Sequence, residues 1–166
     1  RAVNRIDLNT SGLVLFAKNE YVQECLIKQM NSSSFEKTYL TVVFGTLENK
    51  KSTINAPIAR KGNSIIERCV SKNGQIAITH YEVLHEFEGY SLVKCTLGTG
   101  RTHQIRVHMA YIGHPLLGDS LYGKSDQTLI NRQALHSYQM SFIHPVSNKK
   151  ISLEAKLPKD IETLLN

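Results

Sequence analysis

The sequence predicts an α+β domain built on a mixed, mostly antiparallel central sheet with flanking helices. Several short stretches are rich in β-branched and aromatic residues, as strands are, among them residues 37–45 and 90–97. Two other stretches, beginning near residues 20 and 102, space their apolar residues three or four apart, as helices do. Strands and helices mixed in this way are typical of a sheet with helices packed against it.

The first elements are expected close to the N-terminus. Residues 12–17 form a short apolar run, G-L-V-L-F-A, which predicts a buried strand. Residues 20–32 follow a helical pattern, and Asn19 stands where a residue that caps the first turn is expected. The apolar side of this helix carries Val22, Leu26 and Met30.

The middle of the chain predicts most of the sheet. Residues 37–45 read K-T-Y-L-T-V-V-F-G, a strand pattern, and further strands are expected at residues 64–70, 76–85 and 90–97. Asn73-Gly74 stands between the strands expected at residues 64–70 and 76–85, and this dipeptide is a strong signal for a hairpin turn.

A helix is expected after Gly98-Thr99-Gly100, where the pattern changes period. Thr102 is the expected N-terminal cap, and Gly113 is the expected end of the helix. The apolar face of this helix carries Ile105, Met109 and Ile112.

Length and composition fit a single domain. The 166 residues are 41% hydrophobic and contain no repeat or linker-like stretch, so we expect one domain over residues 1–166. Because the chain starts at Arg1 rather than Met, we expect that domain to be N-terminally truncated. Three distant cysteines without a C-x-x-C pair favour a cytoplasmic protein. No apolar run approaches the roughly 18 residues that cross a bilayer, so no membrane partner is expected.

The charge of the chain suggests a polyanionic partner. Twenty basic and fourteen acidic residues give a net charge of +6. A basic protein gains affinity for nucleic acid because each phosphate that it neutralises releases counterions. The net charge alone is equally compatible with a soluble basic protein that does not bind nucleic acid.

Three groups of polar residues are candidates for the functional site. Asp7 stands in the cluster R-I-D-L-N-T-S-G just before the first predicted strand, where an Asx-turn with local hydrogen bonds is the structural alternative. Lys37 and Tyr39 fall on the same side of their strand, and a tyrosine there can stack on a nucleobase. Arg106 falls on the polar face of the second helix, from which a guanidinium beside Asp7 would keep the carboxylate ionised and orient it with a two-pronged contact.

These stretches together resemble the RluA-type RNA pseudouridine synthases. N-R-I-D-L-N-T-S-G is similar to that family's H-R-L-D-x-x-T-S-G, K-T-Y to its K-x-Y element, and G-R-T-H-Q-I-R-V-H, with the later G-H-P and G-D-x-x-Y-G, to its third motif. The resemblance implies that Asp7 is the nucleophile, that Tyr39 packs against the target uracil and that Arg106 is the ion-pair partner of Asp7. It further implies RNA-binding or positioning roles for Arg5, Lys37, Arg101, His103 and Gln104.

The resemblance also implies the activity. The expected enzyme isomerises uridine to pseudouridine in ribosomal or transfer RNA, acts as a monomer and uses no cofactor. It implies as well that this chain lacks the small S4 RNA-binding domain that many members carry first. A non-catalytic RNA-binding module is the alternative, and a metal-assisted nuclease is a weaker one.

A metal site is not expected. His103, His108 and His114 with nearby Asp119 suggest one at first sight. On a helix, however, a spacing of five residues turns the first two histidines roughly 140° apart. The chain also contains no H-E-x-x-H pair.

Overall fold

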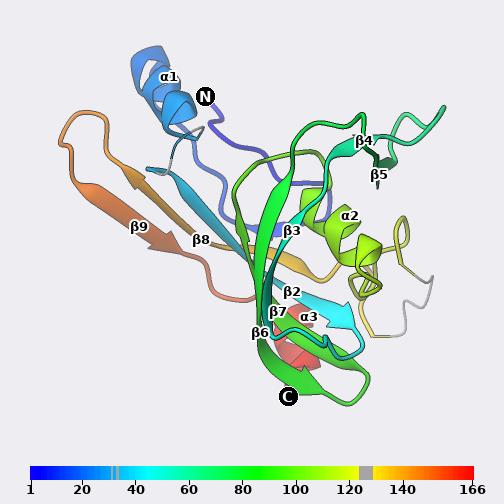
Figure 1. Ribbon diagram of the computed structural model, residues 1–166. Coiled ribbons are helices and arrows are strands. Elements are labelled where there is room, and N and C mark those ends of the chain that lie inside the picture. Colours follow the sequence, from blue (N-terminus) through cyan, green and yellow to red (C-terminus); the bar gives the residue numbers. More distant parts are fainter. Residues whose placement is uncertain (31, 33, 124–128) are drawn as a thin grey trace.

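The structure, a computed structural model, describes residues 1–30, 32, 34–123 and 129–166, and is organised around a seven-stranded sheet (Figure 1). The strand order is β1-β8-β2-β7-β6-β3, and β9 also pairs with β8. Every pairing is antiparallel except that of β1 with β8. The strands are β1 (Ser11–Gly12), β2 (Glu36–Phe44), β3 (Lys51–Asn55), β6 (Ile78–Phe87), β7 (Tyr90–Leu97), β8 (Leu135–Ile143) and β9 (Lys150–Glu154).

A separate two-stranded sheet replaces part of the predicted hairpin. β4 (Ile58–Arg60) pairs with β5 (Arg68–Val70), which is shorter than the strand expected at 64–70. Asn73 and Gly74 do lie in a turn, which the bond from Gly74 N–H to the Ser71 carbonyl closes, but the chain after it returns to Ile58 through a bridge at Gln75. The prediction that this turn joins the two neighbouring strands is therefore wrong. Gly74 is required there, because a Cβ atom would stand 2.5 Å from the backbone of Ile58.

Three helices flank the sheet: α1 (Glu20–Gln29), α2 (Gln104–Tyr111) and α3 (Lys159–Leu164). The Asn19 cap is confirmed, since its Oδ1 accepts the backbone N–H of Val22 at 2.9 Å. The helix ends at Gln29, earlier than expected, and Asn31 lies outside the described residues. The Thr102 cap is wrong, because α2 begins after His103, whose φ of 57° is left-handed.

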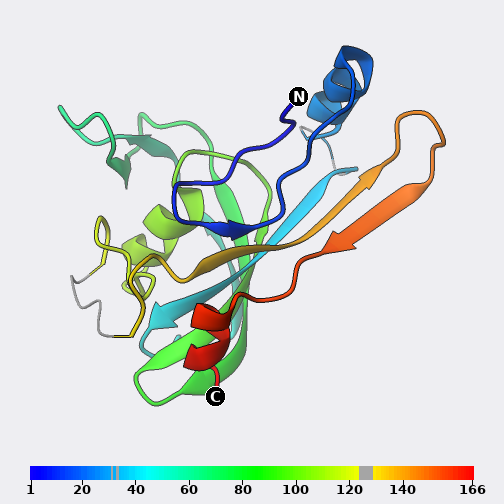
Figure 2. The same cartoon turned by 180° about the vertical axis from the view of Figure 1, so that it is seen from behind.

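The sheet buries apolar side chains on both faces. Because side chains alternate along a strand, Tyr39 and Val43 of β2 pack with Met109 of α2, whereas Val42 packs with Ile161 of α3. Figure 2 shows α3 against the face opposite the one that α2 covers. A third cluster, under α1, gathers Val3, Ala17, Leu26, Phe35, Met140 and Phe142.

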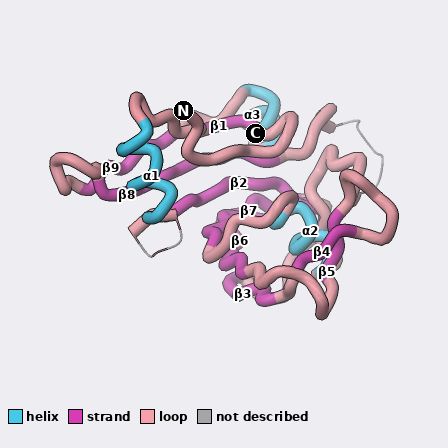
Figure 3. The backbone as a smooth tube through the Cα atoms, turned by 90° about the horizontal axis from the view of Figure 1, so that it is seen from above, coloured by secondary structure: helices cyan, strands magenta, loops and turns pink. Residues whose placement is uncertain are grey.

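The predicted strand at residues 12–17 is largely absent. Only Ser11 and Gly12 join the sheet, in parallel register with His136 and Ser137 of β8, and Phe16 is 66% exposed. Gly12 has a φ of 107°, and a Cβ there would stand 2.2 Å from the Ser137 carbonyl oxygen. Seen from above, β1 runs beside β8, while α1 and α2 lie at different ends of the sheet (Figure 3).

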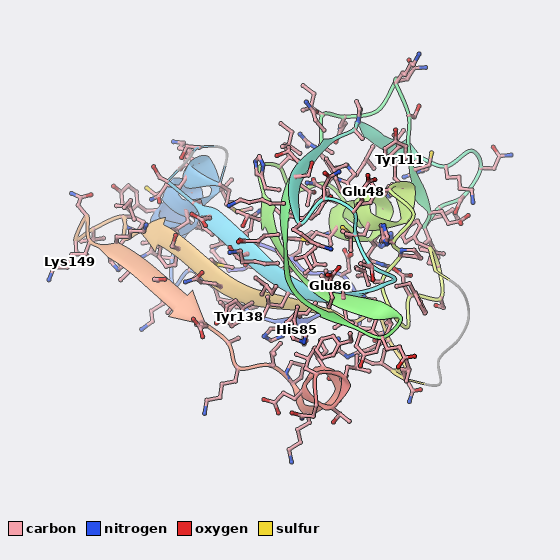
Figure 4. All side chains as sticks on the ribbon, turned by 60° about the horizontal axis from the view of Figure 1, so that its bottom comes forward. Glu48, His85, Glu86, Tyr111, Tyr138 and Lys149 are labelled. Carbon is pink, nitrogen blue, oxygen red and sulfur yellow. The ribbon has the colours of Figure 1, made fainter. Side chains whose placement is uncertain are left out.

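The hairpin of β8 and β9 extends away from α2. Lys149, in the turn between these strands, and Tyr111, the last residue of α2, are labelled at opposite ends of the molecule (Figure 4). This separation sets surface charges on the hairpin apart from those around α2.

Candidate active site

Asp7 begins a tight loop, residues 7–12, called here the Asp7 loop. The backbone N–H of Thr10 donates to the Asp7 carbonyl at 3.0 Å, and Asn9 has a left-handed φ of 66°. Asparagine tolerates that conformation better than most residues, so the sequence suits the turn. The Asp7 side chain remains 17% exposed.

Residues far along the chain hold this loop, in addition to the local bonds that the sequence predicts. The Gln133 side chain donates to the Leu8 carbonyl at 2.5 Å, and Arg132 donates to the Asn9 carbonyl at 2.9 Å. Ser11 Oγ lies 2.9 Å from Nδ1 of His136. The segment that enters β8 therefore fixes the backbone that carries Asp7.

Arg106 contacts two carboxylates, and its two-pronged contact is not the expected one. Its Nε and Nη2 donate to Oδ2 and Oδ1 of Asp119 at 2.7 and 2.9 Å. Its Nη1 lies 3.8 Å from Oδ2 of Asp7, which is an ion-pair distance without a hydrogen bond. The expected partnership of Arg106 with Asp7 is present, but the expectation of a two-pronged contact with Asp7 is wrong, because the fully buried Asp119 takes that position.

The Arg106 guanidinium is held as a cation. Burial alone would lower the pKa of Arg106, but the hydrogen bonds and negative charge of Asp119, with the charge of Asp7, raise it. The guanidinium carbon also lies 5.0 Å from the centre of the Tyr122 ring, a cation–π contact. Asp7 thus faces a positive charge whose orientation other residues fix.

Tyr122 links this arrangement to His103. The Tyr122 hydroxyl accepts the backbone N–H of Arg68 at 2.8 Å and lies 2.7 Å from Nδ1 of His103. Burial lowers the pKa of His103, so its imidazole is neutral at neutral pH. Since the hydroxyl already accepts from Arg68, its own hydrogen can bond to Nδ1, and this orients the imidazole.

A cavity of about 500 Å³ lies in front of Asp7. Binding sites for small organic groups usually measure roughly 300–1,000 Å³, so one nucleotide fits this volume. The lining consists of residues 2–7, Thr10, Met30, Lys37, Tyr39, Leu97, residues 100–105 and Leu135. Seven of the predicted site residues are among them: Arg5, Asp7, Lys37, Tyr39, Arg101, His103 and Gln104. The eighth, Arg106, contacts Asp7.

Tyr39 presents a buried phenol to this cavity. Its side chain is only 7% exposed. Burial, together with the nearby charge of Asp7, raises the pKa of Tyr39, so the phenol keeps its proton at neutral pH. The expected alternation is confirmed, because Lys37 and Tyr39 line the same cavity whereas Thr38 faces the opposite side of the sheet.

Gln104 fixes the cavity wall instead of offering its amide to a ligand. Its nitrogen donates to the Ile78 carbonyl and to Thr79 Oγ1, and its oxygen accepts from Thr99 Oγ1 and the Arg101 backbone. All four hydrogen-bonding positions of the amide are therefore used within the protein. Of the two roles that the motif suggests for Gln104, the structure favours positioning of the loop.

Two site residues were not assigned a role from the sequence, namely Asp119 and Tyr122. Both belong to the G-D-x-x-Y-G stretch, and the similarity of this stretch to the family's motif was the one sign in the sequence that they could belong to the site. Their function as partners of Arg106 and His103 depends on how the chain folds back after α2, which spacing alone does not reveal.

The described part of the chain holds no group of three His, Cys, Asp or Glu side chains arranged to bind a metal. Among the same residues, no helix is long and apolar enough to cross a membrane.

Comparison with known proteins gives consistent matches. A family model described as RNA pseudouridylate synthase matches residues 1–111. In Bacillus subtilis (strain 168), the protein named Uncharacterized RNA pseudouridine synthase YhcT is 45% identical over 166 residues, covering 99% of this chain and 55% of the relative. Ribosomal large subunit pseudouridine synthase D of Nitrosomonas europaea is 40% identical over 171 residues, covering 98% and 49%. The chain thus spans about half the length of these curated relatives.

Solved structures agree on the fold. The human protein named RNA Pseudouridylate Synthase Domain Containing 1 superposes with a TM-score of 0.83 at 26% identity, over 95% of this chain and 69% of that chain. Human RNA Pseudouridylate Synthase Domain Containing 4 gives a TM-score of 0.82 at 20% identity, over 99% and 74%. The predicted α+β fold with a mixed, mostly antiparallel sheet is confirmed.

Proposed function

The chain belongs to the RNA pseudouridylate synthase family, and from this membership we propose that it isomerises uridine to pseudouridine in RNA. The observation that carries the proposal is the position of Asp7 at a nucleotide-sized cavity, 3.8 Å from the Arg106 guanidinium. The resemblance inferred from the three motifs agrees with this membership.

Asp7 is the proposed nucleophile. An ionised carboxylate attacks C1′ of the target ribose and so divides one difficult exchange into two easier steps. Because Asp119 takes the strong hydrogen bonds of Arg106, the Asp7 oxygens stay available to the sugar. The charge of Arg106 still orients and attracts the carboxylate at ion-pair distance.

Tyr39 and the surrounding cations are the proposed RNA contacts. The target uridine leaves its stack and enters the cavity, as bases do in enzymes that act on them. Tyr39 packs against the uracil, and its protonated phenol lies beside the ring. Arg5 and Arg101, both exposed at the cavity, contact the surrounding RNA, and Arg5 holds the place of the displaced base.

Structured ribosomal or transfer RNA is the proposed substrate. The name of the Nitrosomonas europaea relative refers to the large ribosomal subunit, which supports ribosomal RNA as the first substrate to test. We further propose a cytoplasmic monomer that needs no cofactor. Three free cysteines are compatible with a reducing compartment.

Replacement of the carboxylate tests the activity directly. RNA labelled with tritium at uracil C5 releases tritium only if the C5–H bond breaks, as isomerisation requires. We expect wild-type protein to release tritium and Asp7→Asn to lose at least about 10⁴-fold in rate, as nucleophile removal does elsewhere. RNA affinity should remain close to wild type.

The matched control is Glu24→Gln on α1, whose side chain is 67% exposed in a surface pair with Lys28. This variant should react like wild type. Binding of RNA without tritium release by wild-type protein would favour the non-catalytic RNA-binding module, and near-normal turnover by Asp7→Asn would refute the assigned nucleophile.

A further inference from the structure

Lys37 is a buried cation without a visible counter-ion. It is 8% exposed and lines the same cavity as Tyr39, two residues along β2. Among the described residues, no carboxylate lies within ion-pair distance of its ammonium group, and no hydrogen bond to it is found. The group lies close to Gly100, where a Cβ atom would stand 3.2 Å from Nζ.

Burial makes the charge of Lys37 costly. Removal from water disfavours the charged form, and burial accordingly lowers the pKa of Lys37. A buried ion is normally paired, because its lost hydration is otherwise uncompensated. Because Lys37 lines the cavity, an anion or a strong hydrogen-bond acceptor that enters the cavity would compensate this charge.

The cavity offers two different kinds of cation. Arg5 and Arg101 are exposed, as suits contacts with phosphates, which stay close to water on the RNA backbone. Lys37 is in the wall, on the side of β2 from which Tyr39 faces the proposed base. A flat uracil ring reaches that wall more readily than a hydrated phosphate does.

We propose that Lys37 stabilises the negative charge that develops on uracil when the N1–C1′ bond breaks. The inference rests on the proposed function, and Lys37 is thus a further catalytic residue of that reaction. A preorganised charge directed at the atoms that become negative is among the largest contributions to catalysis.

The step is balanced without a co-reactant. An Asp7 oxygen forms a bond to C1′ while the electron pair of the N1–C1′ bond stays on uracil, so the carboxylate becomes a neutral ester and the base an anion. Lys37 donates a hydrogen bond to a ring oxygen that shares this charge and transfers no proton. When C5 then attacks C1′, the ester bond breaks and Asp7 regains its charge. The proton lost from C5 is matched by one taken up at N1.

Lys37→Gln tests the inference in the protein expressed from its complete reading frame. Under single-turnover conditions with saturating protein, we expect the rate of pseudouridine formation to fall about 100-fold, as for loss of one oxyanion-hole donor. RNA affinity should change by less than about threefold, because an interaction made mainly in the transition state contributes little to ground-state binding.

A second substrate separates stabilisation of the base from other roles. RNA with 5-fluorouridine at the target carries a base whose anion is already stabilised by the electron-withdrawing fluorine. Because C5 of this base carries fluorine in place of hydrogen, the rearranged base has no proton to lose there and takes up water instead, so the rate measured is the loss of the starting nucleoside. We expect Lys37→Gln to slow this loss by only about tenfold, a smaller part of the stabilisation that such a donor supplies. Conversion is followed by chromatography and mass spectrometry of nuclease digests.

The controls separate the possible failures. Lys94→Gln removes an exposed lysine paired with Glu82 and should behave like wild type on both substrates. Lys37→Met should unfold at a temperature no lower than wild type, since it removes an uncompensated buried charge, so its inactivity would not reflect misfolding.

Three results would overturn the assignment of Lys37. Equal fold-losses on both substrates would exclude stabilisation of the base, and weaker RNA binding with an unchanged saturated rate would make Lys37 a phosphate contact. A Lys37→Gln variant with the rate and RNA affinity of wild type would exclude any role of Lys37 in the reaction or in RNA binding. In each case wild type still forms pseudouridine, whereas a wild-type protein that forms none would refute the proposed function itself.

Discussion

At the scale of single residues, Arg106 divides its contacts between two carboxylates. Asp119 is completely buried and takes both strong hydrogen bonds, whereas Asp7 keeps partial exposure and only an ion-pair contact. This division supports a structural role for Asp119 and is consistent with the catalytic role that we propose for Asp7. The motifs predicted the proximity of Asp7 and Arg106. A sequence does not indicate which of two acids accepts the two parallel hydrogen bonds of the guanidinium group.

Asp119→Asn should therefore damage the fold more than Asp7→Asn does. Loss of one partner of a buried pair leaves the other charge uncompensated, so we expect the free energy of unfolding to fall by about 3–5 kcal/mol. Denaturant unfolding measures this change. Glu82→Gln breaks a surface pair with Lys94 and is the control, and we expect it to unfold like wild type. Equal stability of Asp119→Asn and Glu82→Gln would contradict the structural role of Asp119.

At the scale of elements, Arg132 connects the Asp7 loop to α3. Besides its bond to the Asn9 carbonyl, Arg132 donates through Nε and Nη2 to Asp160 at 2.7 and 3.0 Å. These hydrogen bonds lower the pKa of Asp160, so the pair persists at neutral pH. A helix near the end of the chain thereby helps to fix a loop near its start.

Asp160→Ala should release this connection while the fold persists. Because Asp160 is 42% exposed, we expect stability to change by less than about 1 kcal/mol. The saturated rate of pseudouridine formation should fall about tenfold, since a small displacement of Asp7 reduces productive alignment. Glu162→Gln on the same helix is the control. An effect on RNA affinity alone would show that Arg132 does not position Asp7.

Strands were predicted accurately where their own residues determine the structure, and less accurately where their position at the sheet edge or a turn determines it. β7 was predicted with the observed bounds, and β2 to within one residue, because their apolar and β-branched residues pack on both faces of the sheet. β3 and β9 were missed because edge strands carry polar, exposed residues that resemble loops. Residues 12–17 were overpredicted because the chain leaves the sheet after two paired residues, Ser11 and Gly12, the second of which has a φ of 107°.

At the scale of the whole molecule, two further hollows adjoin the cavity at Asp7, and basic residues line one of them. The cavity at Asp7 shares Arg101 with a hollow beside β4 and β5, which Arg60 and Arg68 also line. It shares Lys37 with another hollow, which extends to His80. A strand of RNA that leaves the cavity along the hollow beside β4 and β5 would meet Arg60, Arg68 and Arg101.

RNA affinity should accordingly fall steeply with salt. Replacement of both Arg5 and Arg101 by Gln removes two proposed phosphate contacts, so the slope of log affinity against log salt should shrink by roughly one to two. Replacement of both Lys149 and Lys150 by Gln is the matched charge control, because these lysines lie at the turn of the distant β8–β9 hairpin (Figure 4). Equal slopes in the double variant and wild type would place the RNA elsewhere.

The parallel pairing of β1 with β8 limits how far the chain could be shortened before the site around Asp7 fails to form. A polypeptide ending at Tyr111 would retain Asp7, Tyr39 and Arg106, along with every residue that the family model matches. It would lack Asp119, the partner of Arg106, and the strand against which Ser11 and Gly12 are aligned. Such a fragment would contain the whole region that the family model matches and still have an unassembled site, so the smallest working unit has to be delimited by contacts and not by the bounds of that match.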